Sequence, residues 1–326
     1  MNYLEKKMKF DVIVGNPPYQ LKDGGAQSSA TPVYQHFVEQ AKKLKPNYIC
    51  MITPSRWFSG GKGLDEFRNS MLKDLSIRQI HDYPDASECF PNVEIKGGVN
   101  YFVWNRERQG NCLVCTYKKN NLISKMERPL QEENTDIFIR YNEAISIFRK
   151  VRKINENSFS DLISPRKPFG LATNYKANKS KSDNLIKLYR NKGVEYISEN
   201  EIIINKDWVN KHKVIIPYAI GSGDGKTDKV NPIYSEPKSA CTETYIVIGP
   251  FENKNVCDNV VSYINTRFFH FMLTLRKNTQ HATKGTYLYV PLQDFSKSWT
   301  DDELFAKYNF DEKEIRYIKD MIHPEK

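Results

Sequence analysis

The stretch Phe10-Asp-Val-Ile-Val-Gly-Asn-Pro-Pro-Tyr19 decides how the first part of this chain folds. Residues 9–14 are rich in β-branched side chains, which predicts a buried strand. Gly15 and the two prolines after Asn16 then end the strand in a rigid loop, because proline fixes one backbone torsion and has no amide N–H to donate. The sequence therefore predicts a strand whose carboxyl end presents Asn16 to Tyr19.

The segments that follow alternate between helix and strand patterns. Apolar residues at helical spacing predict helices from Thr31 to Leu44 and over 63–74, and β-rich runs predict strands at 48–53, 77–82 and 99–104. This alternation is typical of an α/β fold in which crossover helices cover a mostly parallel sheet. Ligands of such sheets bind at the carboxyl ends of strands, where Asn16 to Tyr19 is expected to lie.

The residues Asn16-Pro17-Pro18-Tyr19 suit chemistry on the amino group of a nucleobase. Such an amine is a poor nucleophile, because its lone pair is delocalised into the aromatic ring. The side-chain carbonyl of Asn16 and a backbone carbonyl beside Pro17 can accept its two hydrogens, and the prolines hold both acceptors in place. Tyr19 offers a flat face to a base taken out of a duplex. The alternative is a proline turn that closes a strand, with Asn16 as a local cap.

On these residues the chain resembles the gamma-class adenine-N6 DNA methyltransferases of restriction–modification systems. The matching segments are 10–19, 31–57, 90–104 and 284–310. The resemblance implies a site-specific enzyme that transfers a methyl group from S-adenosylmethionine to N6 of a flipped adenine in double-stranded DNA. It implies that Asn16 and Pro17 orient the amine and that Tyr19 and Trp104 hold the base, with Phe102 as the second stacking candidate. N4 of cytosine is the alternative target of methylation, since its amine chemistry is the same.

The resemblance does not extend to the motif that binds the cofactor. The family binds S-adenosylmethionine through a Gly-rich turn and an acidic residue upstream of the amine motif, whereas 15 residues precede Asn16 here. We therefore expect a partial Rossmann-like methyltransferase sheet that lacks its cofactor-binding half, with an unpaired edge at the strand over 9–14. A second chain or an upstream region would then carry the donor motif. Gly221-Ser-Gly-Asp-Gly225 offers a permuted donor site, but Pro232 follows it where a helix is needed.

The second part of the chain has the features of a DNA-binding domain. The formal net charge is +10 and the pI is about 9.1, which suits a polyanionic partner. Helices are expected over 139–154, 257–277 and 311–322. We expect a catalytic methyltransferase part at 1–138 and an α/β target recognition domain at 139–326. The candidate DNA-binding residues are Arg276, Lys277, His281 and Lys284.

Three other functions stay open. Pro84-Asp85 with Glu94-Ile-Lys96 resembles the Mg²⁺-binding pattern of nucleases, in which two carboxylates hold the ion and a lysine assists the attacking water. The second is a DNA-binding specificity module without its own catalysis. The third is the methylase portion of a fused restriction endonuclease.

The cysteines and the hydropathy pattern bear on metal binding and on cellular location. Cys112 and Cys115 are the one close cysteine pair, and no second pair completes a zinc site, so no metal centre is expected. The chain shows neither a signal peptide nor an apolar run long enough to cross a bilayer. We therefore expect a cytoplasmic protein without membrane contact.

Overall fold

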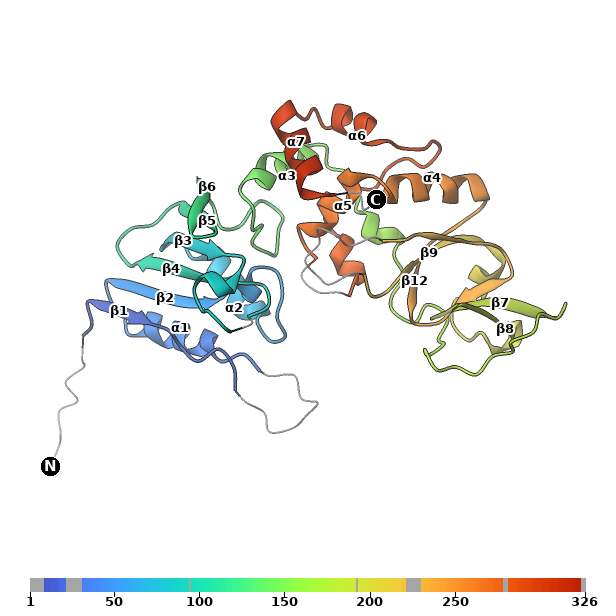
Figure 1. Ribbon diagram of the computed structural model, residues 1–326, viewed down its shortest axis with the longest axis horizontal. Helices are drawn as coiled ribbons and strands as arrows, with labels where there is room; N and C mark the ends of the chain where they lie inside the picture. The colour runs from blue at the N-terminus through green and yellow to red at the C-terminus, as the bar shows by residue number, and fades with distance from the viewer. Residues whose placement is uncertain are drawn as a thin grey trace. The chain divides into compact units, whose positions relative to one another are not determined.

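A computed structural model describes residues 9–21, 31–93, 95–191, 193–220, 230–277 and 281–323. The chain forms two compact units, Met1–Asn142 and Glu143–Lys326. The sequence predicted a boundary at 138/139, and the structure places it at 142/143. Each unit is an α/β body with its own sheet or sheets (Figure 1).

The first unit is built on a six-stranded sheet of order β1-β2-β4-β3-β5-β6. β1 pairs parallel to β2 and β3 pairs parallel to β5, while the other neighbours are antiparallel. The sheet is therefore mixed rather than mostly parallel as the sequence indicated. The reason is local: no α-helix connects β3 to β4 or β5 to β6, and a parallel neighbour needs a long crossover. The strands are β1 Val12–Gly15, β2 Tyr48–Pro54, β3 Ile77–Tyr83, β4 Val99–Asn105, β5 Cys112–Lys118 and β6 Asn121–Arg128.

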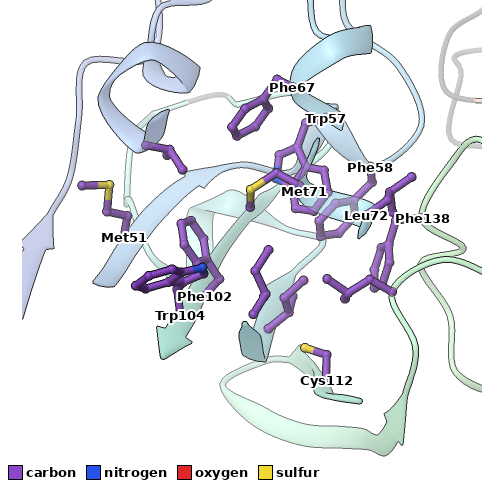
Figure 2. Close-up of a cluster of buried hydrophobic side chains, with 14 of the residues drawn as sticks. Met51, Trp57, Phe58, Phe67, Met71, Leu72, Phe102, Trp104, Cys112 and Phe138 are labelled. Carbon is purple, nitrogen blue, oxygen red and sulfur yellow. The ribbon is translucent and has the colours of Figure 1, made fainter. Parts of the chain in front are cut away.

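Two helices, α1 Tyr34–Lys43 and α2 Asp65–Lys73, pack on this sheet and enclose its core (Figure 2). α1 begins at Tyr34 instead of Thr31, because Pro32 pairs with Gln20 in an isolated bridge and keeps the chain extended there. Short 3₁₀ turns occur at Ser55–Phe58 and Ala86–Glu88. The labelled core side chains come from the sheet, the 3₁₀ turn after β2, α2 and the segment after β6: Met51, Trp57, Phe58, Phe67, Met71, Leu72, Phe102, Trp104, Cys112 and Phe138.

The second unit has two three-stranded sheets, of order β10-β9-β12 and β11-β7-β8. Its strands are β7 Leu185–Arg190, β8 Gly193–Ser198, β9 His212–Pro217, β10 Ile233–Ser235, β11 Ser239–Cys241 and β12 Tyr245–Phe251. Its helices are α3 Glu143–Lys153, α4 Lys254–Ile264, α5 Arg267–Thr274, α6 Asp301–Lys307 and α7 Glu312–Met321, with 3₁₀ turns at Phe159–Leu162, Glu199–Glu201, Lys206–Asn210 and Lys284–Tyr287.

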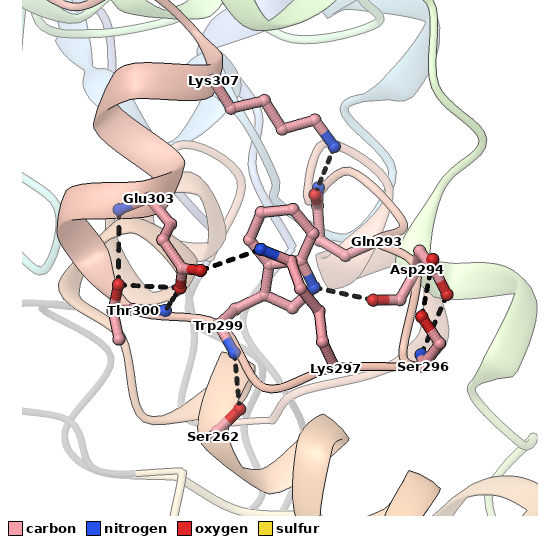
Figure 3. A network of polar contacts seen from close by, with 9 residues as sticks. All are labelled: Ser262, Gln293, Asp294, Ser296, Lys297, Trp299, Thr300, Glu303 and Lys307. Atoms are coloured by element: carbon pink, nitrogen blue, oxygen red, sulfur yellow. Dashed lines mark hydrogen bonds and ion pairs between the residues drawn. The ribbon is translucent and has the colours of Figure 1, made fainter.

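The helix expected over 257–277 is in fact two helices. Thr266 separates α4 from α5, and its hydroxyl caps the second helix by accepting the amide N–H of Phe269 at 3.1 Å. The apolar spacing continues across this break, which is why the sequence alone indicated one helix. The segment before α6 is held by side chains (Figure 3): the Trp299 indole donates to the Asp294 carbonyl at 2.8 Å, and Thr300 forms a capping box with Glu303.

Candidate functional site

Asn16 lies just beyond the carboxyl end of β1, at the edge of the first unit's sheet. Its side chain is exposed, whereas Pro17 next to it is buried. The buried ring anchors the loop while the amide remains open to solvent. Neither the Asn16 side chain nor the Pro17 carbonyl has a hydrogen-bond partner among the residues that the structure describes. Both acceptors that the sequence predicted are therefore available to a ligand.

An apolar groove of about 590 Å³ opens beside Asn16. Pro17 and Pro18 form one wall, and α1 contributes Phe37, which is 47% exposed. The other lining residues come from β1, α1 and β2: Ile13, Gly15, His36, Gln40, Ala41, Leu44 and Met51. Val12 and Val14 alternate with the groove residues Ile13 and Gly15 along β1, so they lie on the other face of the sheet, where they are 53% and 74% exposed.

Tyr19 is half-buried against the core instead of lining the groove. Its ring meets Tyr34 and Phe90 edge-to-face, with centroids 6.5 and 6.2 Å apart. Burial, and secondarily the Cys89 thiol, raises the pKa of Tyr19 to about 12. The phenol is therefore protonated at neutral pH. Its hydroxyl is buried and has no hydrogen-bond partner in the described part of the chain.

Trp104 and Phe102 lie in the hydrophobic core (Figure 2). They are two residues apart on β4, so both point to the same face of the sheet, which α1 and α2 cover. Phe102 is fully buried, and the Trp104 indole donates to Asp74 at 3.0 Å. This packing leaves neither ring face open, so their position does not support the prediction that they stack on a base.

A buried polar cluster lies at the carboxyl ends of β2 and β3, which are interior strands of the same sheet. Ser55 and Arg140 both donate to Asp82, at 2.9 Å from the serine hydroxyl and 2.6 Å from the Arg140 Nε. Arg140 also donates to the Gly97 carbonyl at 2.8 Å. Ser55, Asp82 and Arg140 pair with one another and so hold together the loops around them.

The four predicted DNA-binding residues lie in the second unit in different environments. Arg276 is half-buried and lies over the Tyr289 ring, with 5.2 Å from its guanidinium carbon to the ring centre. Lys277 is 6% exposed, and this burial does not support a phosphate contact. His281 and Lys284 are exposed, so both are accessible to a partner.

The alternative sites gain no support from the structure. Asp85 accepts the Ser87 amide and hydroxyl at 2.9 and 2.7 Å, which caps a 3₁₀ turn and lowers its pKa. Glu94 and the segment Gly221–Gly225 lie outside the described residues. All six cysteines are free thiols, and within the described residues no group of His, Cys, Asp or Glu could hold a metal ion. No described helix is long and apolar enough to span a bilayer.

Comparison with known proteins bears directly on the Asn16 loop. Residues 1–90 match the Eco57I restriction-modification methylase family. A curated relative, an uncharacterized adenine-specific methylase of Mycoplasma pneumoniae, is 36% identical over 147 residues. The resemblance to adenine methylases of restriction–modification systems is therefore confirmed. The match covers 44% of this chain and 34% of the relative, so the chain spans about a third of that protein's length.

Solved structures also show some likeness to this methylase-related chain. The type IIL restriction-modification enzyme MmeI, solved in complex with DNA, gives a TM-score of 0.47 at 9% identity, over 96% of this chain and 52% of that one. The type IIG restriction endonuclease BpuSI gives 0.41 at 12% identity, over 95% and 49%. At such scores the likeness adds nothing to the assignment, which depends on the family match and the relative.

Proposed function

We propose that this chain supplies the amine-binding and DNA-reading parts of a site-specific DNA adenine-N6 methyltransferase. The observation that carries the proposal is Asn16, an exposed amide acceptor fixed by a buried proline at the carboxyl end of β1. The family match over residues 1–90 and the adenine-specific relative favour adenine over cytosine as the target.

Asn16 accepts one hydrogen of the adenine amine, and the carbonyl beside Pro17 accepts the other. Two accepted hydrogen bonds draw the nitrogen toward tetrahedral geometry and localise its lone pair, and the rigid loop lowers the cost of aligning both acceptors. The position of Tyr19 does not support the prediction that it stacks on the base, because its half-buried ring packs against Tyr34 and Phe90. Because its phenol stays protonated at neutral pH, Tyr19 does not act as a base.

The groove beside Asn16 does not fit S-adenosylmethionine, the methyl donor that the resemblance implies. That donor carries a charged amino-acid end and ribose hydroxyls, which need polar partners. Asn16, His36 and Gln40 are the polar side chains that line the groove, and its lining holds no carboxylate. We therefore assign donor binding to a further polypeptide, either a second chain or another segment of the same protein.

The free edge of β1 is the place where that polypeptide joins. An edge strand offers unpaired backbone groups for another strand to pair with. Parallel strands are usually buried on both faces, yet Val12 and Val14 are more than half exposed. A strand added beside β1 pairs with its free backbone groups, and a helix of the same polypeptide that packs on the face carrying Val12 and Val14 covers these side chains.

The test is DNA methylation in a bacterial host that lacks other adenine methylases. The chain is expressed with its adjoining reading frames, and N6-methyladenine is mapped by sequencing the genomic DNA. We expect Asn16→Ala to lower the methylation rate at the mapped site about 100-fold, the loss typical of removing one preorganised hydrogen-bonding group. The matched control is Asn69→Ala, which alters an exposed asparagine on α2.

Undiminished methylation by the Asn16→Ala variant contradicts the proposed chemistry. If the wild-type protein binds a defined DNA sequence and leaves it unmethylated in every context, the specificity module without catalysis is the better assignment.

A further inference from the structure

Arg166, Tyr218 and His281 form a stack in the second unit, which we call the Arg166 stack; Arg166 and His281 are exposed and Tyr218 is half-buried. The Arg166 guanidinium carbon lies 5.2 Å from the centre of the Tyr218 ring. The Tyr218 and His281 rings are stacked, with centroids 5.0 Å apart and planes inclined by 24°. The three residues come from segments that are distant in sequence, so no local sequence motif predicts that they lie together.

Backbone pairing and an ion pair hold the Arg166 stack in place. The Tyr218 amide donates to the Thr244 carbonyl at 2.8 Å, and the Tyr218 carbonyl accepts the Ala282 amide at 2.9 Å. Arg166 Nη2 lies 3.1 Å from a carboxylate oxygen of Glu243. The guanidinium is therefore fixed in two ways, by the ring beneath it and by a carboxylate at one edge.

Glu243 is itself a well-anchored partner. Its carboxylate accepts the backbone N–H of Thr173 at 3.1 Å, and this bond, followed by the charge of Arg166, lowers the pKa of Glu243. The carboxylate is thus ionised at neutral pH. The nearby cations Lys167 and Lys284 are exposed, so the surroundings of the stack attract a polyanion.

We propose that Arg166 reads the major-groove edge of a guanine in the DNA target, with Tyr218 and Glu243 as positioning residues. A planar guanidinium matches the O6 and N7 acceptors of guanine with two parallel N–H groups. The Arg166 side chain is 58% exposed, and only its Nη2 edge faces Glu243. Because the stack orders the side chain beforehand, binding loses little rotamer freedom. This inference depends on the proposed function, since it assumes that the second unit reads DNA.

The experiment is selection from a random duplex library by the whole chain, followed by sequencing. The wild-type protein is expected to enrich a motif with a required guanine. Arg166→Ala should keep the rest of the motif, lose the guanine at one position, and bind the wild-type motif about 10- to 100-fold more weakly. The matched control is Arg316→Ala, which removes an exposed arginine on α7 and should leave the motif unchanged.

The positioning residues give a second, independent readout. Tyr218→Leu and Glu243→Gln should relax the preference at the same position, while Tyr218→Phe should restore it, because the ring is all that the stack requires. A structural defect would instead weaken binding equally at every position.

An unchanged motif from Arg166→Ala overturns the inference, as does an equal loss at all positions. Neither result contradicts the proposed function, because Asn16-dependent methylation is measured in a separate assay. A wild-type chain that enriches no motif also overturns the inference, and the methylation assay then shows whether the proposed function fails with it.

Discussion

Lys213, on β9, shows how strongly burial can change one residue. Its side chain is fully buried, and its ammonium donates to the backbone carbonyls of Trp208 at 2.9 Å and of Lys211 at 2.7 Å. Burial lowers the pKa of Lys213 from 10.5 to about 8. The lysine thus closes the turn before β9 with hydrogen bonds, at the cost of removing a charge from water.

We predict that the wild-type protein gains stability relative to Lys213→Met as the pH rises from about 8 to 10.5. In this window the unfolded chain still holds the lysine proton and the folded protein has released it, so the free energy of unfolding increases with pH. Below the window both states are protonated and the difference is constant. The full gain approaches about 3 kcal/mol. Urea denaturation at a series of pH values measures it, with the exposed Lys206→Met as the control. Parallel pH profiles for the wild type and Lys213→Met would contradict this assignment.

The sequence predicted the position of Asn16 and Pro17 beyond the end of β1, but not the surroundings of the aromatic residues. Asn16 and Pro17 could be identified because their geometry is set by neighbours in the chain. Trp104 and Phe102 could not be placed, because alternation along a strand shows which residues share a face without showing which face the helices cover. The Arg166 stack was missed for a related reason, since Tyr218 meets Arg166 only through the pairing of distant segments.

At the scale of single elements, β1 is the most consequential. It is an edge strand whose exposed side chains are apolar, so it is suited to pair with another strand. We predict that Val14→Lys reduces self-association of the purified chain, because a charge on the edge opposes strand pairing, and that it lowers methylation where the wild type is active. Sedimentation velocity over a range of concentrations measures the first effect.

The matched control for this prediction is Val194→Lys, which places the same charge on β8, an edge strand of the second unit. Equal changes in association for the two variants would mean that the effect is one of net charge and not of the β1 edge.

The strands of the first unit were more predictable than their order in the sheet. β2, β3 and β4 end within a residue of the expected bounds, because apolar runs between turn residues define them locally. The antiparallel insertion of β4 between β2 and β3 depends on which strand edges are free when the chain returns, and no local pattern encodes that. The break at Thr266 is a similar case, since a capping hydroxyl interrupts an apolar spacing that continues on both sides.

At the scale of the whole molecule, we propose that the two units have different functions. The first presents an amine-binding loop beside an open edge, and the second presents an arginine held ready for a base. The change in composition near residue 139 was enough to indicate two bodies, because a boundary leaves a trace in the pattern of elements. The sequence also predicted, from the missing Gly-rich turn, that another polypeptide binds the methyl donor, and a groove lining without a carboxylate agrees with that prediction.

This division makes donor binding a property of an assembly. Calorimetric titration of the purified chain with S-adenosylmethionine should give a dissociation constant weaker than about 1 mM, because the groove has too few polar groups to hold the donor's charged end. The chain copurified with the product of its adjoining reading frame should bind the donor in the micromolar range. Val14→Lys should abolish the second binding and leave the first unchanged. Micromolar binding by the purified chain alone would contradict the assignment of the donor to a separate polypeptide, and would require the groove beside Asn16 to change shape around its ligand.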